Sequence, residues 1–189
     1  MSVALHHYMC FAVIAHHVPH TTVPANRPHR PVSAPPKRSP RAETGQPVRT
    51  RYVVRGWRLA RQLVTEHKLK VRLWTDDLIS FQKINPEIDP RLSVQVSCGV
   101  EIRQWAESNM AVEPADVVIE AFGCELPVAY VAAMAKSGRR HAWVNLEYLS
   151  AEEWVDSHHG LPSPHPRLPL IKHFFFPGFT PSTGGLLVE

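Results

Sequence analysis

The sequence is poor in cysteine and has no long apolar run. Only Cys10, Cys98 and Cys124 occur among its 189 residues, and no two of them form a Cys-x-x-Cys pair. Few, widely spaced cysteines argue against a disulfide framework or a structural zinc site, and they are typical of the cytoplasm, where we place the protein. We interpret Cys124 as a small buried side chain. No apolar run approaches the roughly 18 residues of a membrane-spanning helix, so we expect no membrane partner.

Three common motifs are absent as well. The sequence contains no G-x-G-x-x-G, no G-x-x-x-x-G-K-[ST] and no G-x-S-x-G. These absences exclude a dinucleotide fingerprint, a phosphate loop and the nucleophile elbow of hydrolases. We interpret His159, His165 and the Gly-Gly turn of "STGGLL" (182–187) as structural, rather than as a metal site or a phosphate cradle. The sequence therefore predicts no metal and no bound cofactor.

Acidic residues are scarce before Trp57. Residues 1–56 hold eight Lys or Arg and a single acid, Glu43, a net charge of +7, whereas residues 57–189 have a net charge of −3. Such a basic stretch can bind nucleic acid, but we favour an arm without a partner. Residues 17–50 also hold eight prolines, which remove backbone donors and block helices and sheets. We therefore predict that residues 1–50 are disordered, with no signal peptide in the apolar stretch 9–15.

Regular periodicity begins near Trp57. We expect helices at 57–69, 78–84, 126–138 and 150–160, and strands at 70–77, 99–105, 115–122, 141–149 and 172–179. The fourth helix has Ser150 and Glu153 at the spacing of a capping box. Alternating strands and helices predict an α/β fold, a Rossmann-like parallel sheet with helices on both faces, over residues 51–189.

Ligands of open α/β sheets bind outside the carboxyl ends of the strands, which directs attention to four loops. These are residues 75–78, 120–127, 145–152 and 176–186. Carboxylates there are candidates for acid–base chemistry, because burial and neighbouring charges can raise their pKa values. We interpret Asp76 and Asp77 as caps of the following helix. The candidate cleft and acceptor-side residues are Glu120, Glu125, Asn145, Glu147 and Tyr148.

Several long runs resemble one bacterial family. The runs are "WRLARQLVTEH", "VRLWTDDL", "ADVVIEAFGCELP", "WVNLEYLSAEEWVDSHHGLPSPHPRLPL" and "FFFPGFTPSTGGLL". They resemble EarP, the family of protein-arginine rhamnosyltransferases that mature elongation factor P, from about Trp57 to Glu189. The resemblance implies the N-terminal, acceptor-side half of a two-domain GT-B glycosyltransferase. It also implies transfer of L-rhamnose from dTDP-β-L-rhamnose to an arginine of elongation factor P, with inversion and without a metal.

Residues 1–55 do not share this resemblance. In the family, a loop of the form D-N-[FY]-G-D-x-G-V precedes the first helix and carries the catalytic aspartates. A protonated guanidinium is a poor nucleophile, so a carboxylate must hold it and accept its proton. This chain has Tyr52 to Gly56 at that place, and no aspartate precedes Asp76. We therefore assign no catalytic residue and expect a truncated or frame-disrupted, inactive form. The alternative is a non-catalytic module that recognises elongation factor P.

The loop's absence would also remove the strand before it. In a doubly wound sheet that strand is central, and its loss leaves unpaired backbone groups on both neighbours. We expect "RYVVR" (51–55), which is β-branched, to substitute for it, or the domain to be marginally stable.

Overall fold

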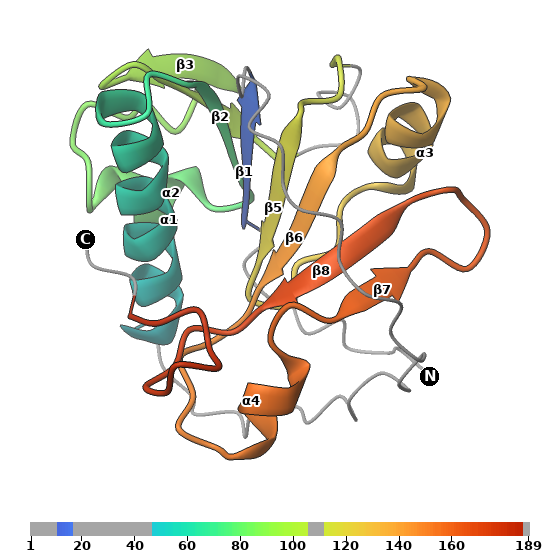
Figure 1. Cartoon of the computed structure of the whole chain (residues 1–189). Coiled ribbons are helices and arrows are strands. Elements are labelled where there is room, and N and C mark those ends of the chain that lie inside the picture. Colours follow the sequence, from blue (N-terminus) through green and yellow to red (C-terminus); the bar gives the residue numbers. More distant parts are fainter. Residues whose placement is uncertain (1–10, 17–46, 106–111, 187–189) are drawn as a thin grey trace, which may run out of the picture.

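The computed structural model describes residues 11–16, 47–105 and 112–186, which form one eight-stranded sheet and four helices (Figure 1). The strand order is β3-β4-β2-β1-β5-β6-β8-β7. The strands are β1 (Phe11–His16), β2 (Lys70–Thr75), β3 (Val94–Ser97), β4 (Val100–Gln104), β5 (Val117–Ala121), β6 (Ala142–Leu146), β7 (Pro162–Pro164) and β8 (Ile171–Phe175). The helices are α1 (Pro47–Thr65), α2 (Leu78–Gln82), α3 (Val128–Lys136) and α4 (Trp154–His158). No helix within these residues is both long and apolar enough to cross a bilayer.

The α/β class is confirmed, but the sheet is mixed rather than wholly parallel. Strands β2 and β4 pair in parallel, and so do β5, β6 and β8. The edge strands β3 and β7 are antiparallel to their neighbours, and the sequence analysis predicted neither of them. Cys98 and Gly99, both with positive φ, form the two-residue turn between β3 and β4, which is the geometry of a tight hairpin.

Helices cover both faces of the sheet, as predicted. On one face, α1 and α2 pack on the sheet through side chains such as Val53, Trp57 and Phe81. On the other face, α3 packs through Tyr130, Val131 and Met134. Figure 1 shows α1 and α3 on opposite sides of the sheet. The apolar core is therefore divided into two layers by the sheet, as two-sided burial of an α/β sheet requires.

The central strand of the sheet comes from the segment that we expected to be disordered. Strand β1 lies between β2 and β5 and is antiparallel to both. Val13 and Ala15 are buried under α1, whereas Ala12 and Ile14 are buried on the α3 face. The prediction of disorder is therefore wrong for residues 11–16, because a continuous apolar run can be buried on both faces of a sheet. The rest of the predicted arm, residues 1–10 and 17–46, lies outside the described residues.

The expected substitute strand at 51–55 is a helix instead. Helix α1 begins at Pro47, ten residues before the predicted start, and the prediction of disorder is wrong for residues 47–50 too. Val53, Trp57 and Ala60 are buried on one stripe at helical spacing, so packing on β1 and β2 favours the helix. Proline is well tolerated at the first helical position, and Gly56 costs only about 1 kcal/mol inside a helix.

Helix α4 is shorter than predicted and lacks the capping box. Its N-cap is Glu153, whose side chain makes no capping hydrogen bond. The Ser150 hydroxyl instead accepts the Glu152 N–H at 3.1 Å, which forms a local turn. The other helices and strands predicted from residue 70 onward are confirmed, with shorter bounds.

Candidate functional site

The candidate site is the edge of the sheet where the parallel strands β2, β5, β6 and β8 end. Because β1 runs against these strands, its first residue lies at this edge, with Phe11 opposite Thr75, and its last residue lies at the other, with His16 opposite Lys70. The backbone of the loops here is tightly connected. The Glu147 N–H donates to the Phe175 carbonyl at 2.9 Å, and the Phe122 N–H donates to the Leu146 carbonyl at 2.8 Å.

Glu120 on β5 is held from two sides. Its side chain is 1% exposed; Oε1 accepts the Leu126 N–H at 3.0 Å, and Oε2 accepts the Lys172 ammonium on β8 at 2.6 Å. The Lys172 Nζ also lies 4.9 Å from the centre of the Trp143 ring, within the range of a cation–π contact. Both oxygens of this carboxylate are thus engaged by groups of the protein. Glu120 therefore positions the loop 122–127 against β8.

Asn145 and Glu147 lie beside this ion pair. Asn145 stands opposite Glu120 in the parallel pairing of β5 and β6, so both side chains lie on the α3 face of the sheet. The Asn145 amide donates to Glu147 Oε1. Burial raises the pKa of the Glu147 carboxyl, and the Asn145 hydrogen bond and the Lys172 charge oppose this rise. The structure thus brings together three of the five predicted residues, and adds Lys172, which the sequence analysis did not identify.

The other two predicted residues lie elsewhere. Tyr148 stacks on Phe122 with ring centres 5.1 Å apart, and its hydroxyl donates to the Phe122 carbonyl at 3.3 Å. It packs on the α1 side of the sheet, away from Glu120. Glu125 is exposed in the loop that follows β5. Phe122 and Gly123 both have positive φ in this loop, and for a phenylalanine that conformation is strained.

The residues interpreted as structural have structural contacts. Asp77 caps α2, because its carboxylate accepts the Ser80 N–H at 2.9 Å; the same role for Asp76 is wrong, since Asp77 is the N-cap. His159 Nδ1 accepts the Phe176 N–H, and His165 Nδ1 accepts the Leu168 N–H. Cys124 is buried, as predicted.

The glycine turn has little room for a ligand group. A Cβ atom on Gly184 would clash with the Phe175 ring. The Gly184 N–H donates to the Phe176 carbonyl at 2.9 Å. Gly184 is therefore needed because the turn packs closely on β8, which agrees with its interpretation as a turn rather than a phosphate cradle.

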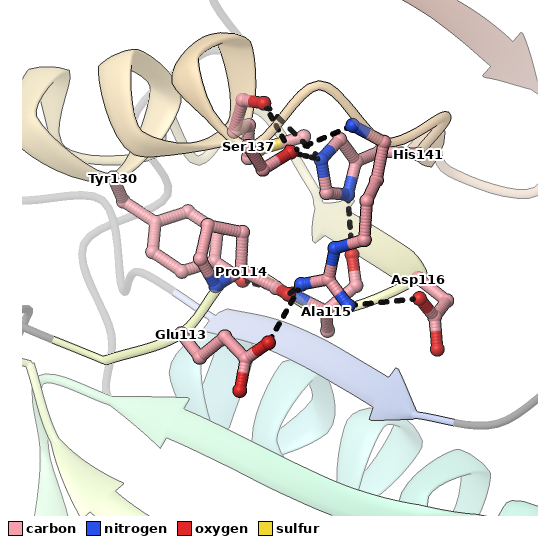
Figure 2. Close-up of polar contacts among 9 residues, drawn as sticks. Glu113, Pro114, Ala115, Asp116, Tyr130, Ser137 and His141 are labelled. Atoms are coloured by element: carbon pink, nitrogen blue, oxygen red, sulfur yellow. Dashed lines mark hydrogen bonds and ion pairs between the residues drawn. The ribbon is translucent and has the colours of Figure 1, made fainter.

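A second polar cluster lies at the opposite edge of the sheet (Figure 2). The Arg139 guanidinium, just after α3, lies 3.2 Å from the Glu113 carboxylate and 3.5 Å from Asp116, and it also donates to the Pro114 carbonyl. Burial lowers the pKa of His16 at the end of β1, and Arg72 lowers it further while Asp116 opposes the change. This cluster joins α3 to the start of β5.

The imidazole of His141 completes this second cluster. Its Nδ1 donates to the Ala115 carbonyl at 2.6 Å, and its Nε2 lies 2.7 Å from the Ser137 hydroxyl (Figure 2). The Tyr130 hydroxyl accepts the Ala115 N–H at 3.0 Å. Its hydrogen bonds and ion pairs connect the end of α3 and the residues after it to residues 113–116, so we assign it a role in holding α3 on the sheet. No motif in the sequence indicated it.

The fold defines the class: an open α/β domain with one mixed eight-stranded sheet. The chain belongs to the EarP family, because the family described as "Elongation-Factor P (EF-P) rhamnosyltransferase EarP" matches residues 53–189. The resemblance seen in the sequence motifs is thereby confirmed. The match begins inside α1, so strand β1 lies outside it.

Three relatives named protein-arginine rhamnosyltransferase show the extent of the similarity. The Pseudomonas putida protein is 57% identical over 133 residues, which cover 70% of this chain and 35% of that relative. The Pseudomonas aeruginosa protein is 54% identical over 133 residues, with the same coverage. The Neisseria meningitidis protein is 38% identical over 138 residues, 70% of this chain and 34% of the relative. The chain thus spans about a third of the length of these relatives.

The raised pKa of Glu147 gives a prediction for the pH dependence of stability. A carboxyl with a raised folded-state pKa contributes stability below its ordinary pKa of about 4.3, and this contribution is lost as the pH rises through the folded-state pKa. In Glu147→Gln, the amide oxygen can still accept from Asn145, and the titration is removed. The stability of the variant relative to the wild type should therefore increase as the pH rises from about 4 to about 7.

Urea unfolding at both pH values measures this difference, with the exposed Glu152→Gln as the control. If Glu147→Gln changes the free energy of unfolding equally at both pH values, the result contradicts a raised pKa of Glu147.

Proposed function

We propose that this chain is the acceptor-side domain of a protein-arginine rhamnosyltransferase, and that it recognises elongation factor P. In the whole enzyme the reaction would transfer L-rhamnose from dTDP-β-L-rhamnose to an arginine of that factor, with inversion. The domain would correspond to the N-terminal Rossmann-like half of a GT-B glycosyltransferase in the cytoplasm. The match to the family over residues 53–189 carries the proposal, because it includes every described loop at the carboxyl edge of the sheet.

We further propose that the chain alone transfers no sugar. The reaction requires a carboxylate that can hold a guanidinium and accept its proton. No aspartate occurs before Asp76, and Glu120 is engaged by Lys172 and by the Leu126 N–H. The slot that would hold the strand before the family's aspartate loop is occupied here by β1, which runs in the opposite direction to β2 and β5.

The loops at the carboxyl edge of the sheet support recognition of a protein partner. Loops 122–127 and 147–153 lie at one edge, and the buried Glu120, paired with Lys172, fixes the first of them. Such pre-positioned loops can bind a protein surface without a large ordering cost. Binding to elongation factor P without chemistry is therefore the activity that the described residues support best.

Isothermal titration calorimetry of the chain with unmodified elongation factor P tests recognition. We expect saturable binding that does not depend on dTDP-β-L-rhamnose, because the chain lacks the catalytic loop. The control is Arg140→Gln, an exposed residue just before β6 at the opposite edge of the sheet, which should bind as the wild type does. Absence of binding by a chain that unfolds cooperatively would refute the proposal.

A further inference from the structure

One indole is displayed at the carboxyl edge of the sheet. Trp154, the first residue of α4, is 42% exposed, although its ring is fixed on two sides. Its ring meets the buried Phe176 edge-to-face, with centroids 5.4 Å apart, and the His158 ring at 5.3 Å. Its Nε1–H donates to Glu152 Oε2. These contacts restrict the orientation of the ring, so a ligand that stacks on it would cost less side-chain entropy than one on a free side chain.

Acidic residues lie near this indole along the chain. The chain has no Lys or Arg from residue 141 to 166, whereas the same stretch has four acids, Glu147, Glu152, Glu153 and Asp156. Glu152 and Glu153 are exposed beside Trp154, and within the described residues neither forms an ion pair. Asp156 accepts the Thr180 hydroxyl at 2.7 Å, which joins α4 to the turn after β8. The surface thus combines a restrained aromatic ring with two exposed carboxylates, and no Lys or Arg occurs in the stretch 141–166 that carries them.

A guanidinium fits this combination better than other groups do. The planar cation of arginine stacks on an indole face and at the same time donates paired hydrogen bonds to a carboxylate. Lysine lacks the planar stacking and the paired donors. An apolar ligand would gain nothing from the carboxylates, and an anion would be repelled by them.

We propose that Trp154, Glu152 and Glu153 form a docking platform for an arginine side chain of the polypeptide acceptor. This inference rests on the proposed function, and it names the surface and the side chain through which recognition occurs. The platform binds; it takes no part in bond formation. Its neighbour Asp156 holds the turn 176–186 beside it.

A double-mutant cycle measured by calorimetry tests the platform. The proteins are the wild type, Trp154→Ala and Glu152→Gln/Glu153→Gln, each titrated with elongation factor P and with a variant in which its target arginine is lysine. We expect each platform variant to bind the unaltered factor about tenfold more weakly, the loss typical of an interface anchor. Against the lysine variant the platform changes should have little further effect, because the arginine that they contact is already gone.

The controls separate the platform from the fold. The paired glutamine variant changes only exposed side chains and keeps an acceptor for the Trp154 N–H, so it should fold as the wild type does. Glu66→Gln, an exposed acid on the other side of the molecule next to α1, should bind with unchanged affinity. Circular dichroism on the same samples verifies that Trp154→Ala is folded.

The outcomes are distinct. If the wild type binds and both platform variants bind equally well, the inference is overturned and the proposed function stands. If the platform change weakens binding by the same factor with the unaltered factor and with its lysine variant, the side chain that docks here is not that arginine. If Trp154→Ala instead converts a dimer into a monomer in light scattering, the surface joins two copies of this chain. A wild type that binds nothing overturns the proposed function together with this inference.

Discussion

Val13→Asp is expected to abolish the cooperative unfolding transition of this chain. Val13 is 0% exposed at the centre of β1, where it stands opposite Leu73 on one neighbouring strand and Ile119 on the other. Its side chain lies in the apolar layer beneath α1, with no cation to pair with a carboxylate. Burying an unpaired charge there costs several kcal/mol, a large part of the about 5–15 kcal/mol by which domains are stable.

Thermal unfolding followed by circular dichroism measures this effect. The control is the same change at an exposed position, Val128→Asp, where the residue is 86% exposed at the start of α3. An acid at a helix N-terminus is neutral or mildly stabilising, so this variant should unfold as the wild type does. Ile14→Val gives a graded result in a protein that still folds, with an expected cost of about 1 kcal/mol. A Val13→Asp chain with a wild-type transition would show that β1 is not the central strand.

Lys172→Met is expected to destabilise the chain by about 3–5 kcal/mol. The change leaves Glu120, a carboxylate that is 1% exposed, without its cation. The reverse change, Glu120→Gln, should cost less, since Lys172 is 22% exposed and can be solvated, and the glutamine oxygen can still accept the Leu126 N–H. Lys172→Met should cost more than Glu120→Gln because it leaves the buried partner, Glu120, without a counter-charge.

The double variant Glu120→Gln/Lys172→Met separates the ion pair from the packing. With both charges removed, no uncompensated carboxylate remains, so the double variant should be more stable than Lys172→Met alone. Urea unfolding of the four proteins gives the coupling free energy directly. Additive effects would indicate that the two side chains do not interact, in conflict with the 2.6 Å contact.

Local patterns predicted the elements after residue 70 well. The apolar run 115–122 is long enough and apolar enough to indicate a buried parallel strand, and β5 is largely buried, parallel to β6 and antiparallel to β1. Pro47 is a signal for the true start of α1 that the sequence analysis did not use, because proline is favoured at a first helical position. The proline density around it suggested disorder more strongly than this one position suggested a helix.

The position of β1 could not be predicted from local sequence. Residues 11–16 form an apolar run that fits a strand as well as it fits other buried segments. Its place depends on two strands, β2 and β5, that lie far along the chain and expose free edges toward each other without it. The same limit applies to the candidate site. Glu120 was recognised as a carboxylate at a strand end, but its partner Lys172 lies 52 residues away and becomes a neighbour only in the folded sheet.

Native mass spectrometry of the chain mixed with unmodified elongation factor P and dTDP-β-L-rhamnose tests recognition and transfer together. One spectrum reports both the complex and the mass of the acceptor. We expect a complex of the chain with the factor, in which the acceptor keeps its original mass after prolonged incubation. An acceptor heavier by one deoxyhexose would contradict the claim that the chain transfers no sugar, and a spectrum without a complex would contradict its role in recognition.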